Sequence, residues 1–295
     1  MIPTYRPRED YLRKSIESVL QQNSGSNQMQ IEVVDDSSPD IDVEMMVNRI
    51  AGKRITFSRT QKNLGLAGCW NACIGRSRGQ WVHILHQDDY VLPGFYSTLA
   101  QAAERHPEAG LLASRSFFVD AAGIIYAVSE RLKKLENGSR TIEDFFYRTP
   151  IQCPGVVVKR SFYETHGGFR SDLTYALDCE MWVRVIGSAG GWATPEVLSC
   201  YRQSDTSETG RLCRSAENLK DIDRLNRIFF ERYPEFDLKQ AKAHQLGRSL
   251  QMAALFEEKN DQEAAATSWD YWKRNASIPL RLRRFFGGFK RKPLK

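Results

Sequence analysis

Residues 63–93 read NLGLAGCWNACIGRSRGQWVHILHQDDYVLP, and the rest of the chain can be interpreted outward from them. Residues 81–85 are a short apolar run of strand-favouring types, which stops at His86, Gln87, Asp88 and Asp89. An unpaired charge at the end of a buried strand costs several kcal/mol. A divalent cation would remove that cost, and hard oxygen ligands suit Mg²⁺ or Mn²⁺. One hypothesis is therefore a turn that holds a metal against the phosphates of a nucleotide.

The alternative for the same turn needs no ligand. Asp88 and Asp89 could lie in a surface turn and cap a helix whose first turn follows Pro93. Acidic residues are common at turns and helix caps. Residues 86–89 alone therefore leave both interpretations open.

Composition and charge limit the classes of partner. The chain has 295 residues and a net charge of +6, but residues 279–295 alone contribute +7 and contain no acid. The remaining residues carry a net charge of −1, so the basic character belongs to the tail and does not indicate a nucleic-acid-binding body. The sequence contains no run of 18 or more apolar residues, so no membrane span is expected. The start lacks the features of a signal peptide.

The six cysteines favour a reducing compartment. None forms a CxxC pair, and a disulfide framework is not expected in a chain this long with so few cysteines. Cys69 and Cys73 are four residues apart, so they would share one face of a helix as core thiols. We therefore expect a cytoplasmic protein.

Strands and helices alternate over the first hundred residues. Strands are expected near residues 2–5, 31–34, 55–57 and 81–85, with helices between them. This alternation predicts a parallel, doubly wound sheet, in which ligands bind beyond the carboxyl ends of the strands. Three such ends are polar: residues 3–5, residues 35–36 and residues 86–89. Their expected convergence on one edge favours the metal hypothesis.

The pattern changes after residue 110. Short strands are expected at residues 111–114, 117–119, 124–128, 155–158 and 196–201. A helix that starts near Tyr175 carries Asp178 in its first turn, where the helix dipole alone would favour an acid. Beyond about residue 210, the apolar spacing predicts three helices without evident chemistry.

Several motifs together resemble a family 2 glycosyltransferase with the GT-A fold. They are IPTYRP, VVDDSSPD, the stretch at residues 63–93, PGVVVKRSFYETHGGF, LTYALDCEMWVRV and EVLSCYRQSDTS, in that order along residues 1–207. The resemblance implies an α/β fold: a doubly wound, mostly parallel mixed sheet flanked by helices. The expected domains are a transferase domain at 1–207 (nucleotide-binding half 1–105, acceptor and catalytic half 106–207), a helical extension at 208–278 and a basic aromatic tail at 279–295.

The resemblance also implies roles for single residues. A nucleotide pocket would be formed by Pro3, Thr4, Tyr5, Asp35, Asp36, Asn63, Gly65, Asn71 and Gln87, with Asp36 accepting a hydrogen bond from the base. The metal, Mn²⁺ or Mg²⁺, would be held by Asp88, Asp89 and His86, and Asp178 would be the general base. Three positions depart from the usual pattern of the family: His86 replaces an Asp, Leu177 replaces an acid, and Ser204 replaces a histidine.

The activity implied is inverting, metal-dependent transfer from a nucleotide diphosphate sugar to a hydroxyl of a glycan or lipid-linked acceptor, in surface polysaccharide biosynthesis. One carboxylate base suffices for a single displacement, whereas retention would need a nucleophile as well. The alternatives are a nucleotide-sugar-binding scaffold and a sugar-nucleotide nucleotidyltransferase. Residues 279–295 interleave cations with Leu and Phe, so they are expected either to dock on an anionic inner membrane face or to remain solvated.

Overall fold

The computed structural model describes residues 1–295 except 23–28, 133–134, 136–138, 148, 206 and 277–295. The chain divides into two compact units, Met1–Ser204 and Asp205–Lys295. The predicted membrane contact of residues 279–295 lies outside the described residues, so it stays a prediction.

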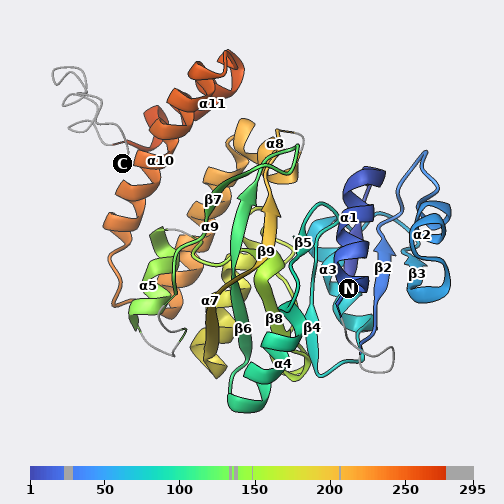
Figure 1. Cartoon of the computed structure of the whole chain (residues 1–295). Coiled ribbons are helices and arrows are strands. Elements are labelled where there is room, and N and C mark those ends of the chain that lie inside the picture. Colours follow the sequence, from blue (N-terminus) through green and yellow to red (C-terminus); the bar gives the residue numbers. More distant parts are fainter. Residues whose placement is uncertain (23–28, 133–134, 136–138, 148, 206, 277–295) are drawn as a thin grey trace. The chain divides into compact units, whose positions relative to one another are not determined.

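The first unit contains all the strands of the described chain (Figure 1). The strands are β1 (Ile2–Thr4), β2 (Glu32–Asp35), β3 (Thr56–Arg59), β4 (Trp81–His83), β5 (Tyr90–Val91), β6 (Leu111–Val119), β7 (Ile125–Val128), β8 (Val156–Lys159) and β9 (Gly191–Arg202). The helices are α1 (Glu9–Leu20), α2 (Val43–Ala51), α3 (Gly65–Arg76), α4 (Phe95–Arg105), α5 (Ser139–Tyr147), α6 (Arg160–His166) and α7 (Leu177–Ala189). Two short 3₁₀ turns complete it, η1 (Gly52–Arg54) and η2 (Cys153–Gly155).

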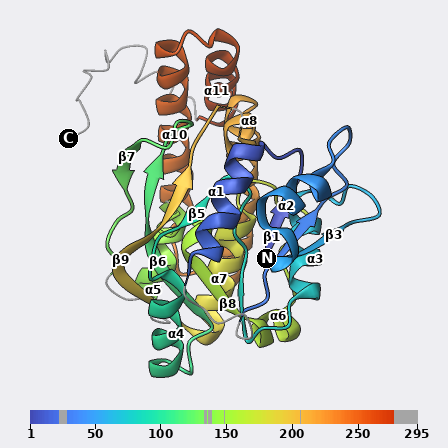
Figure 2. The same ribbon diagram turned by 45° about the vertical axis from the view of Figure 1, so that its right-hand side comes forward.

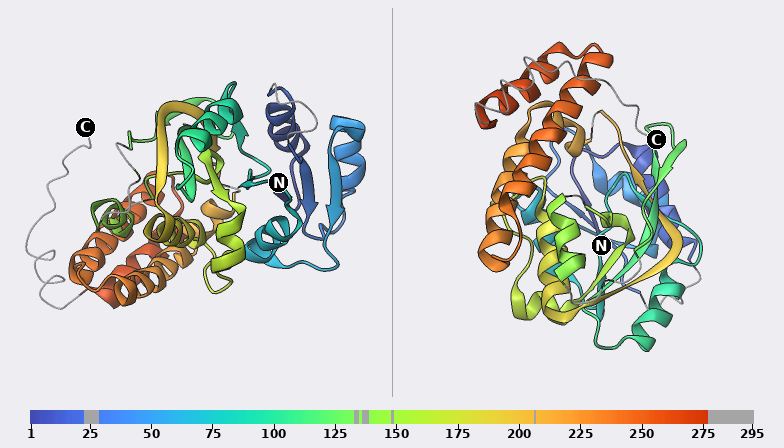
Figure 3. Two further views of the ribbon diagram at one scale, coloured as in Figure 1. Left: turned by 90° about the horizontal axis from the view of Figure 1, so that it is seen from below. Right: turned by 90° about the vertical axis from the view of Figure 1, so that its left-hand side faces the viewer.

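The first sheet is parallel, in the order β1-β2-β3, as the alternating pattern predicts for these three strands. The fourth expected strand, β4, instead pairs antiparallel with β8 in the second sheet. Helices α1 and α2 lie on one face and α3 on the other (Figure 3). Val33 packs in the core with α1 and α2, while the next residue, Val34, points to the opposite face. Burial on both faces explains why β2 reads as a continuous apolar run.

Backbone hydrogen bonds join this sheet to the central strand. The Met1 nitrogen lies 2.9 Å from the His83 carbonyl oxygen, and the Leu85 N–H donates to the Met1 carbonyl at 3.0 Å. The Asp36 N–H donates to the Thr4 carbonyl at 2.8 Å. The carboxyl ends of β1, β2 and β4 therefore lie side by side, as expected from the three polar strand ends.

The second sheet has the order β4-β8-β6-β9-β5, with β7 paired to β6. Only β6 and β9 pair in parallel, and the other pairs are antiparallel. The strands predicted at residues 111–114 and 117–119 are one strand, β6, which crosses a register irregularity near Arg115. Strand β9 begins at Gly191, five residues before the predicted start. Local apolar patterns missed both features because β6 and β9 stabilise each other through long-range pairing.

The second unit is helical where it is described, as the apolar spacing predicts (Figure 2). It consists of α8 (Glu208–Arg214), α9 (Glu217–Arg232), α10 (Leu238–Glu258) and α11 (Gln262–Asn275). Asp237 and Asp261 cap α10 and α11 by accepting hydrogen bonds from backbone N–H groups of the first turns. No helix of the described residues is long and apolar enough to cross a membrane.

His83 in β4 shows how tightly the core beneath the site is packed. Its Nδ1 lies 2.9 Å from the Tyr96 hydroxyl, and its Nε2 lies 3.1 Å from the Pro154 carbonyl oxygen. Since a carbonyl only accepts, Nε2 carries the proton and Nδ1 accepts from the hydroxyl. Burial lowers the pKa of His83 to about 3, so the ring is neutral in the folded chain.

This lowered pKa predicts acid sensitivity. The folded His83 rejects a proton that the unfolded residue binds below about pH 6.5, so its stabilising contribution is present above that pH. The contribution is lost progressively as the pH falls from about 6.5 towards 3. The free energy of unfolding, measured by urea titration at several pH values in this range, should fall less steeply with decreasing pH in His83→Gln than in the wild type. Parallel curves would contradict the assignment.

Candidate active site

The turn after β4 gathers three ligand-type side chains. One ligand atom from each of His86, Asp88 and Asp89 lies within 4.8 Å of the others. Asp89 is 1% exposed, and its Oδ2 lies 3.4 Å from His86 Nδ1. Within the described part of the chain, Asp89 Oδ2 and His86 Nε2 are buried without a hydrogen-bond partner. Such buried atoms indicate a ligand that would bind there.

The charges of these groups are strongly coupled. Burial and the neighbouring Asp89 raise the pKa of Asp88 to about 6. Burial alone would lower the pKa of His86, but Cys153 and Asp89 beside the ring hold this pKa well above its usual value. The ring of Trp70 stacks on His86, with 4.6 Å between centroids. The turn thus gathers a buried carboxylate, Asp89, with a half-buried carboxylate and a half-buried imidazole, those of Asp88 and His86.

This donor set fits a divalent cation. Carboxylate oxygens suit Mg²⁺ and Mn²⁺, and an imidazole is tolerated better by Mn²⁺. A ligating imidazole must be neutral, so a cation and the proton on His86 compete for the same site. Asp88 and Asp89 could hold such a cation with His86 as a third donor, and their ligation stays a prediction.

Arg202, at the end of β9, holds residues 86–89, the acidic turn, in place. The sequence analysis did not identify this residue. Its backbone N–H donates to Asp89 Oδ1 at 2.8 Å, and its Nε donates to the Asp88 carbonyl at 3.0 Å. Its Nη1 donates to the carbonyl oxygens of Asp120, at 2.9 Å, and Ala121, at 3.2 Å. One buried side chain therefore ties the acidic turn to the turn between β6 and β7.

Two aromatic rings hold the guanidinium of Arg202. Its central carbon lies 4.2 Å from the Tyr11 ring centroid and 5.9 Å from that of Tyr90. In the sequence, Arg202 could be noticed only as an arginine that directly follows the last predicted strand. An arginine at such a position is ordinarily exposed, because arginines are seldom fully buried.

The predicted nucleotide residues cluster at the same edge of the first sheet. The buried Asp36 accepts hydrogen bonds from the Thr60 hydroxyl at 3.1 Å, the Leu64 N–H at 2.9 Å and the Gly65 N–H at 3.0 Å. Asn63 joins this group, since its Oδ1 accepts from Gly65 N at 3.1 Å. Asp36 therefore orders the start of α3, and its bond to a nucleobase stays a prediction.

Asp35 supports the loop next to it. It is fully buried and accepts from both the N–H and the hydroxyl of Ser38, at 3.1 and 2.5 Å. The Arg59 guanidinium lies 3.3 Å from the same carboxylate. Asp35 thus shapes the strand end from inside the fold.

Gln87 links the acidic turn to the end of β1. Its Oε1 accepts from Tyr5 N at 2.9 Å, and its Nε2 donates to the Tyr5 carbonyl at 3.2 Å. Pro3 and Thr4 are buried in β1, whereas Tyr5 is 42% exposed. Of these three predicted pocket residues, only Tyr5 presents a large open side chain.

Asn71 holds two segments together. Its Nδ2 donates to the Phe169 carbonyl at 2.9 Å, and its Oδ1 accepts from the Phe169 N–H at 2.7 Å. A Cβ on Gly168 would come within 2.1 Å of that Oδ1, so a larger residue there would displace the Asn71 side chain from its two hydrogen bonds. Asn71 thus anchors the segment before α7 to α3, and a direct contact with a nucleotide stays a prediction.

Asp178 lies in the first turn of α7, as predicted. Its Oδ1 accepts from Cys179 N at 2.7 Å. Burial raises the pKa of the Cys153 thiol, and the charges of Asp178 and Asp89 raise it further. His86 acts on the same thiol in the opposite direction. Asp178 and Asp89 are therefore both close enough to Cys153 for their charges to act on its thiol.

An aromatic chain runs from the acidic turn to α7. Trp70, which stacks on His86, meets Phe169 edge to face at 4.8 Å, and Phe169 meets Trp182 of α7 at 6.1 Å. Such contacts add about 0.5–1.5 kcal/mol each beyond area burial. These ring contacts connect α7, through Trp182, to the indole that stacks on His86.

The Asn71 contact generates a local prediction. Asn71→Ala should speed amide hydrogen exchange at Phe169, because the variant leaves a formerly bonded N–H without its acceptor and costs about 1–3 kcal/mol. Asn48→Ala, at an exposed position of α2, should leave that exchange rate unchanged. Unaltered protection of Phe169 in Asn71→Ala would refute the proposed role of this contact.

Arg202 should matter for stability. Arg202→Gln would leave buried carbonyl groups without their donor, and it should lower the free energy of unfolding by about 2–4 kcal/mol in urea titrations. Arg170→Gln is the matched control, because Arg170 pairs with Asp172 at the surface and should change stability by less than about 1 kcal/mol. Equal effects of the two substitutions would contradict the account of Arg202.

The fold has known counterparts among solved structures. Staphylococcus aureus TarS, solved with UDP-GlcNAc, superposes with a TM-score of 0.59 at 16% identity, covering 94% of this chain and 91% of that one. The Pyrobaculum calidifontis mannosyltransferase PcManGT, solved with GDP-Man and Mn²⁺, has a TM-score of 0.55 at 16% identity, covering 95% and 76%. At these identities the likeness concerns the fold, and it confirms the GT-A architecture.

Sequence comparison is more specific. The succinoglycan biosynthesis protein ExoO of Rhizobium meliloti is 35% identical over 163 residues, which cover 55% of this chain and 41% of that protein. The present chain thus spans less than half the length of this relative. Residues 1–166, more than half of the chain, match the sequence model of glycosyl transferase family 2. The chain belongs to glycosyl transferase family 2 and is a glycosyl transfer enzyme.

Proposed function

We propose that the protein transfers a sugar, with inversion and with the help of a divalent cation, from a nucleotide diphosphate sugar to a hydroxyl group of a glycan or lipid-linked acceptor. The observation that carries this proposal is the acidic turn, in which one ligand atom from each of His86, Asp88 and Asp89 lies within 4.8 Å of the others. The charges of Asp178 and Asp89 both act on the Cys153 thiol, which supports a carboxylate near this cluster. A cation cluster and a separate carboxylate are the two parts that such a displacement needs.

The donor would bind at the joined strand ends. Tyr5 offers an open aromatic ring there, and Gln87 fixes its backbone. Asp36, which accepts from the Leu64 and Gly65 N–H groups at the start of α3, follows β2 at the same edge. TarS and PcManGT were solved with UDP-GlcNAc and GDP-Man respectively, which supports a nucleotide sugar as donor.

The cation would be held by Asp88 and Asp89, with His86 as the third ligand. When bound, it supplies positive charge that neutralises the departing diphosphate. Mn²⁺ is the first candidate, because His86 is among the donors and PcManGT was solved with Mn²⁺.

Asp178 would act as the general base. As the acceptor oxygen forms its bond to the anomeric carbon, the bond from that carbon to the diphosphate breaks and the electron pair leaves with the phosphate. The proton of the acceptor hydroxyl passes to the Asp178 carboxylate. A single displacement of this kind inverts the anomeric centre.

The acceptor and the pathway are proposed on chemical class. ExoO is named for succinoglycan biosynthesis, which supports a growing glycan as acceptor. A lipid-linked glycan would place the enzyme at the inner membrane face, where residues 279–295 would contribute cations.

Two substitutions separate the proposed roles. Asp178→Asn should lower the rate of sugar transfer by about 10²–10⁴-fold while nucleotide binding is retained, because only proton removal is impaired. Asp88→Asn should lower the rate of sugar transfer and should also weaken Mn²⁺-dependent binding of the donor. Transfer is measured with UDP- and GDP-sugars and a mixed glycan acceptor, and binding is measured by thermal shift with UDP or GDP and Mn²⁺.

The control is Asp172→Asn, which removes an exposed carboxylate just before α7 and should leave both readouts unchanged. Full activity of Asp178→Asn would exclude it as the base. Binding without turnover in the wild type would favour the scaffold alternative. Formation of a nucleotide sugar from a sugar phosphate and a nucleoside triphosphate would favour the nucleotidyltransferase alternative.

A further inference from the structure

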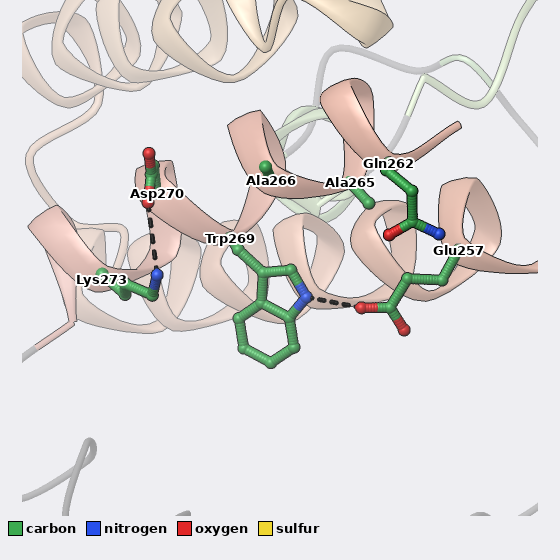
Figure 4. A pocket seen from close by; sticks show the side chains of 7 residues that line it. All are labelled: Glu257, Gln262, Ala265, Ala266, Trp269, Asp270 and Lys273. Atoms are coloured by element: carbon green, nitrogen blue, oxygen red, sulfur yellow. Dashed lines mark hydrogen bonds and ion pairs between the residues drawn. The ribbon is translucent and has the colours of Figure 1, made fainter. Parts of the chain in front are cut away.

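The second unit contains a hollow that the transfer reaction does not use. It has a volume of about 380 Å³ and lies along α11 and the end of α10 (Figure 4). Small-molecule sites have volumes of about 300–1,000 Å³, so this hollow is at the lower end of that range. We name it the Trp269 groove, after the aromatic residue at its centre.

The residues of the groove form one helix face. Ala265, Ala266, Trp269, Asp270 and Lys273 recur at the three- and four-residue spacing that aligns side chains along α11. The small side chains of the two alanines leave open space beside the indole. The spacing therefore leaves the large ring of Trp269 next to an open, shallow floor.

The indole is held in a fixed orientation. Its Nε1–H donates to Glu257 Oε1 at 2.9 Å, and its ring packs edge to face against Trp272 at 6.1 Å. Trp269 is partly buried against the core of the helical unit, and its side chain lines the groove. A ring fixed in this way loses little side-chain entropy when a ligand binds.

Planar and charged polar groups flank the ring on both sides. Glu257 and Gln262 lie on one side, and Asp270 and Lys273, paired at 3.3 Å, lie on the other (Figure 4). All four are exposed. Carboxylates, amides and an ammonium can each hydrogen-bond to hydroxyl groups, and their spacing around one ring matches a ligand that is apolar on its face and polar at its edges.

We propose that the Trp269 groove binds a pyranose ring of a glycan, with the C–H face of the sugar on the indole and its hydroxyls on Glu257, Gln262 and Asp270. A quaternary ammonium ligand fits less well, because such ligands select cages of several aromatic rings and Lys273 would repel the cation. A nucleic acid fits less well, since two carboxylates line the groove. The proposed function enters only in naming a glycan as the class of ligand.

The test uses the full chain and three neutral probes: cellohexaose, chitohexaose and maltohexaose. Each is titrated to about 10 mM, which covers the weak binding expected of a single-ring site. The readout is the indole N–H resonance of Trp269 in ¹H–¹⁵N spectra, assigned by its loss in Trp269→Phe. We expect a saturable shift of this resonance with at least one probe.

A blocking variant and its match complete the design. Ala266→Arg fills the groove at an exposed helical position and should weaken binding at least about tenfold. Ala254→Arg makes the same change on the exposed surface of α10 outside the groove and should bind like the wild type. No shift with any probe, or equal binding by both variants, would overturn the proposal.

This outcome is separable from that of the proposed function. Binding at Trp269 without sugar transfer would leave the groove established and count against the catalytic account. Sugar transfer without binding at Trp269 would support the catalytic account and overturn the proposal for the groove. Ala266→Arg should retain transfer to a short acceptor, because the groove lies outside the residues assigned to catalysis.

Discussion

The burial of Asp89 is the constraint on which the rest of the site depends. A carboxylate that is 1% exposed needs compensation, and here one oxygen accepts from the Arg202 backbone while the other faces His86. Arg202 is itself buried, and it is held by backbone carbonyls and two tyrosine rings. The cost of placing this charge in the fold is therefore shared by β9, the acidic turn and the β6–β7 turn. One acceptor atom of the carboxylate remains without a hydrogen bond, which is the property expected of a cation ligand.

The same constraint explains why distant segments meet. The parallel pairing of β1 and β2 and the bonds between Met1 and β4 align three strand ends, and Gln87 fixes the first of them to the acidic turn. Asn71 and the aromatic chain from Trp70 to Trp182 bring α7 to the same place. Several residues that resemble ligand contacts in the sequence thus act first as links within the protein, and a donor would bind to an edge that is already ordered.

Much of this arrangement could be predicted from the sequence. The alternation of strands and helices predicts the parallel first sheet, and the position of Asp178 in the first turn of α7 follows from the helical pattern. The full lengths of β6 and β9 and the two-residue strand β5 could not be predicted, because pairing between residues about 80 to 110 positions apart, and not local propensity, stabilises them. Arg202 could not be identified for a similar reason. Its role depends on carbonyl groups at residues 88, 120 and 121, whose proximity only the folded chain reveals.

The central claim is that strand ends far apart in the chain assemble a cation site opposite Asp178. Anomalous diffraction from crystals grown with Mn²⁺ and UDP, and with Mn²⁺ and GDP, tests it most directly. The account predicts a manganese peak at bonding distance from Asp88 or Asp89, in contact with a diphosphate, with the Asp178 carboxylate facing the same cavity. A peak elsewhere, or a nucleotide bound away from this turn, would contradict it.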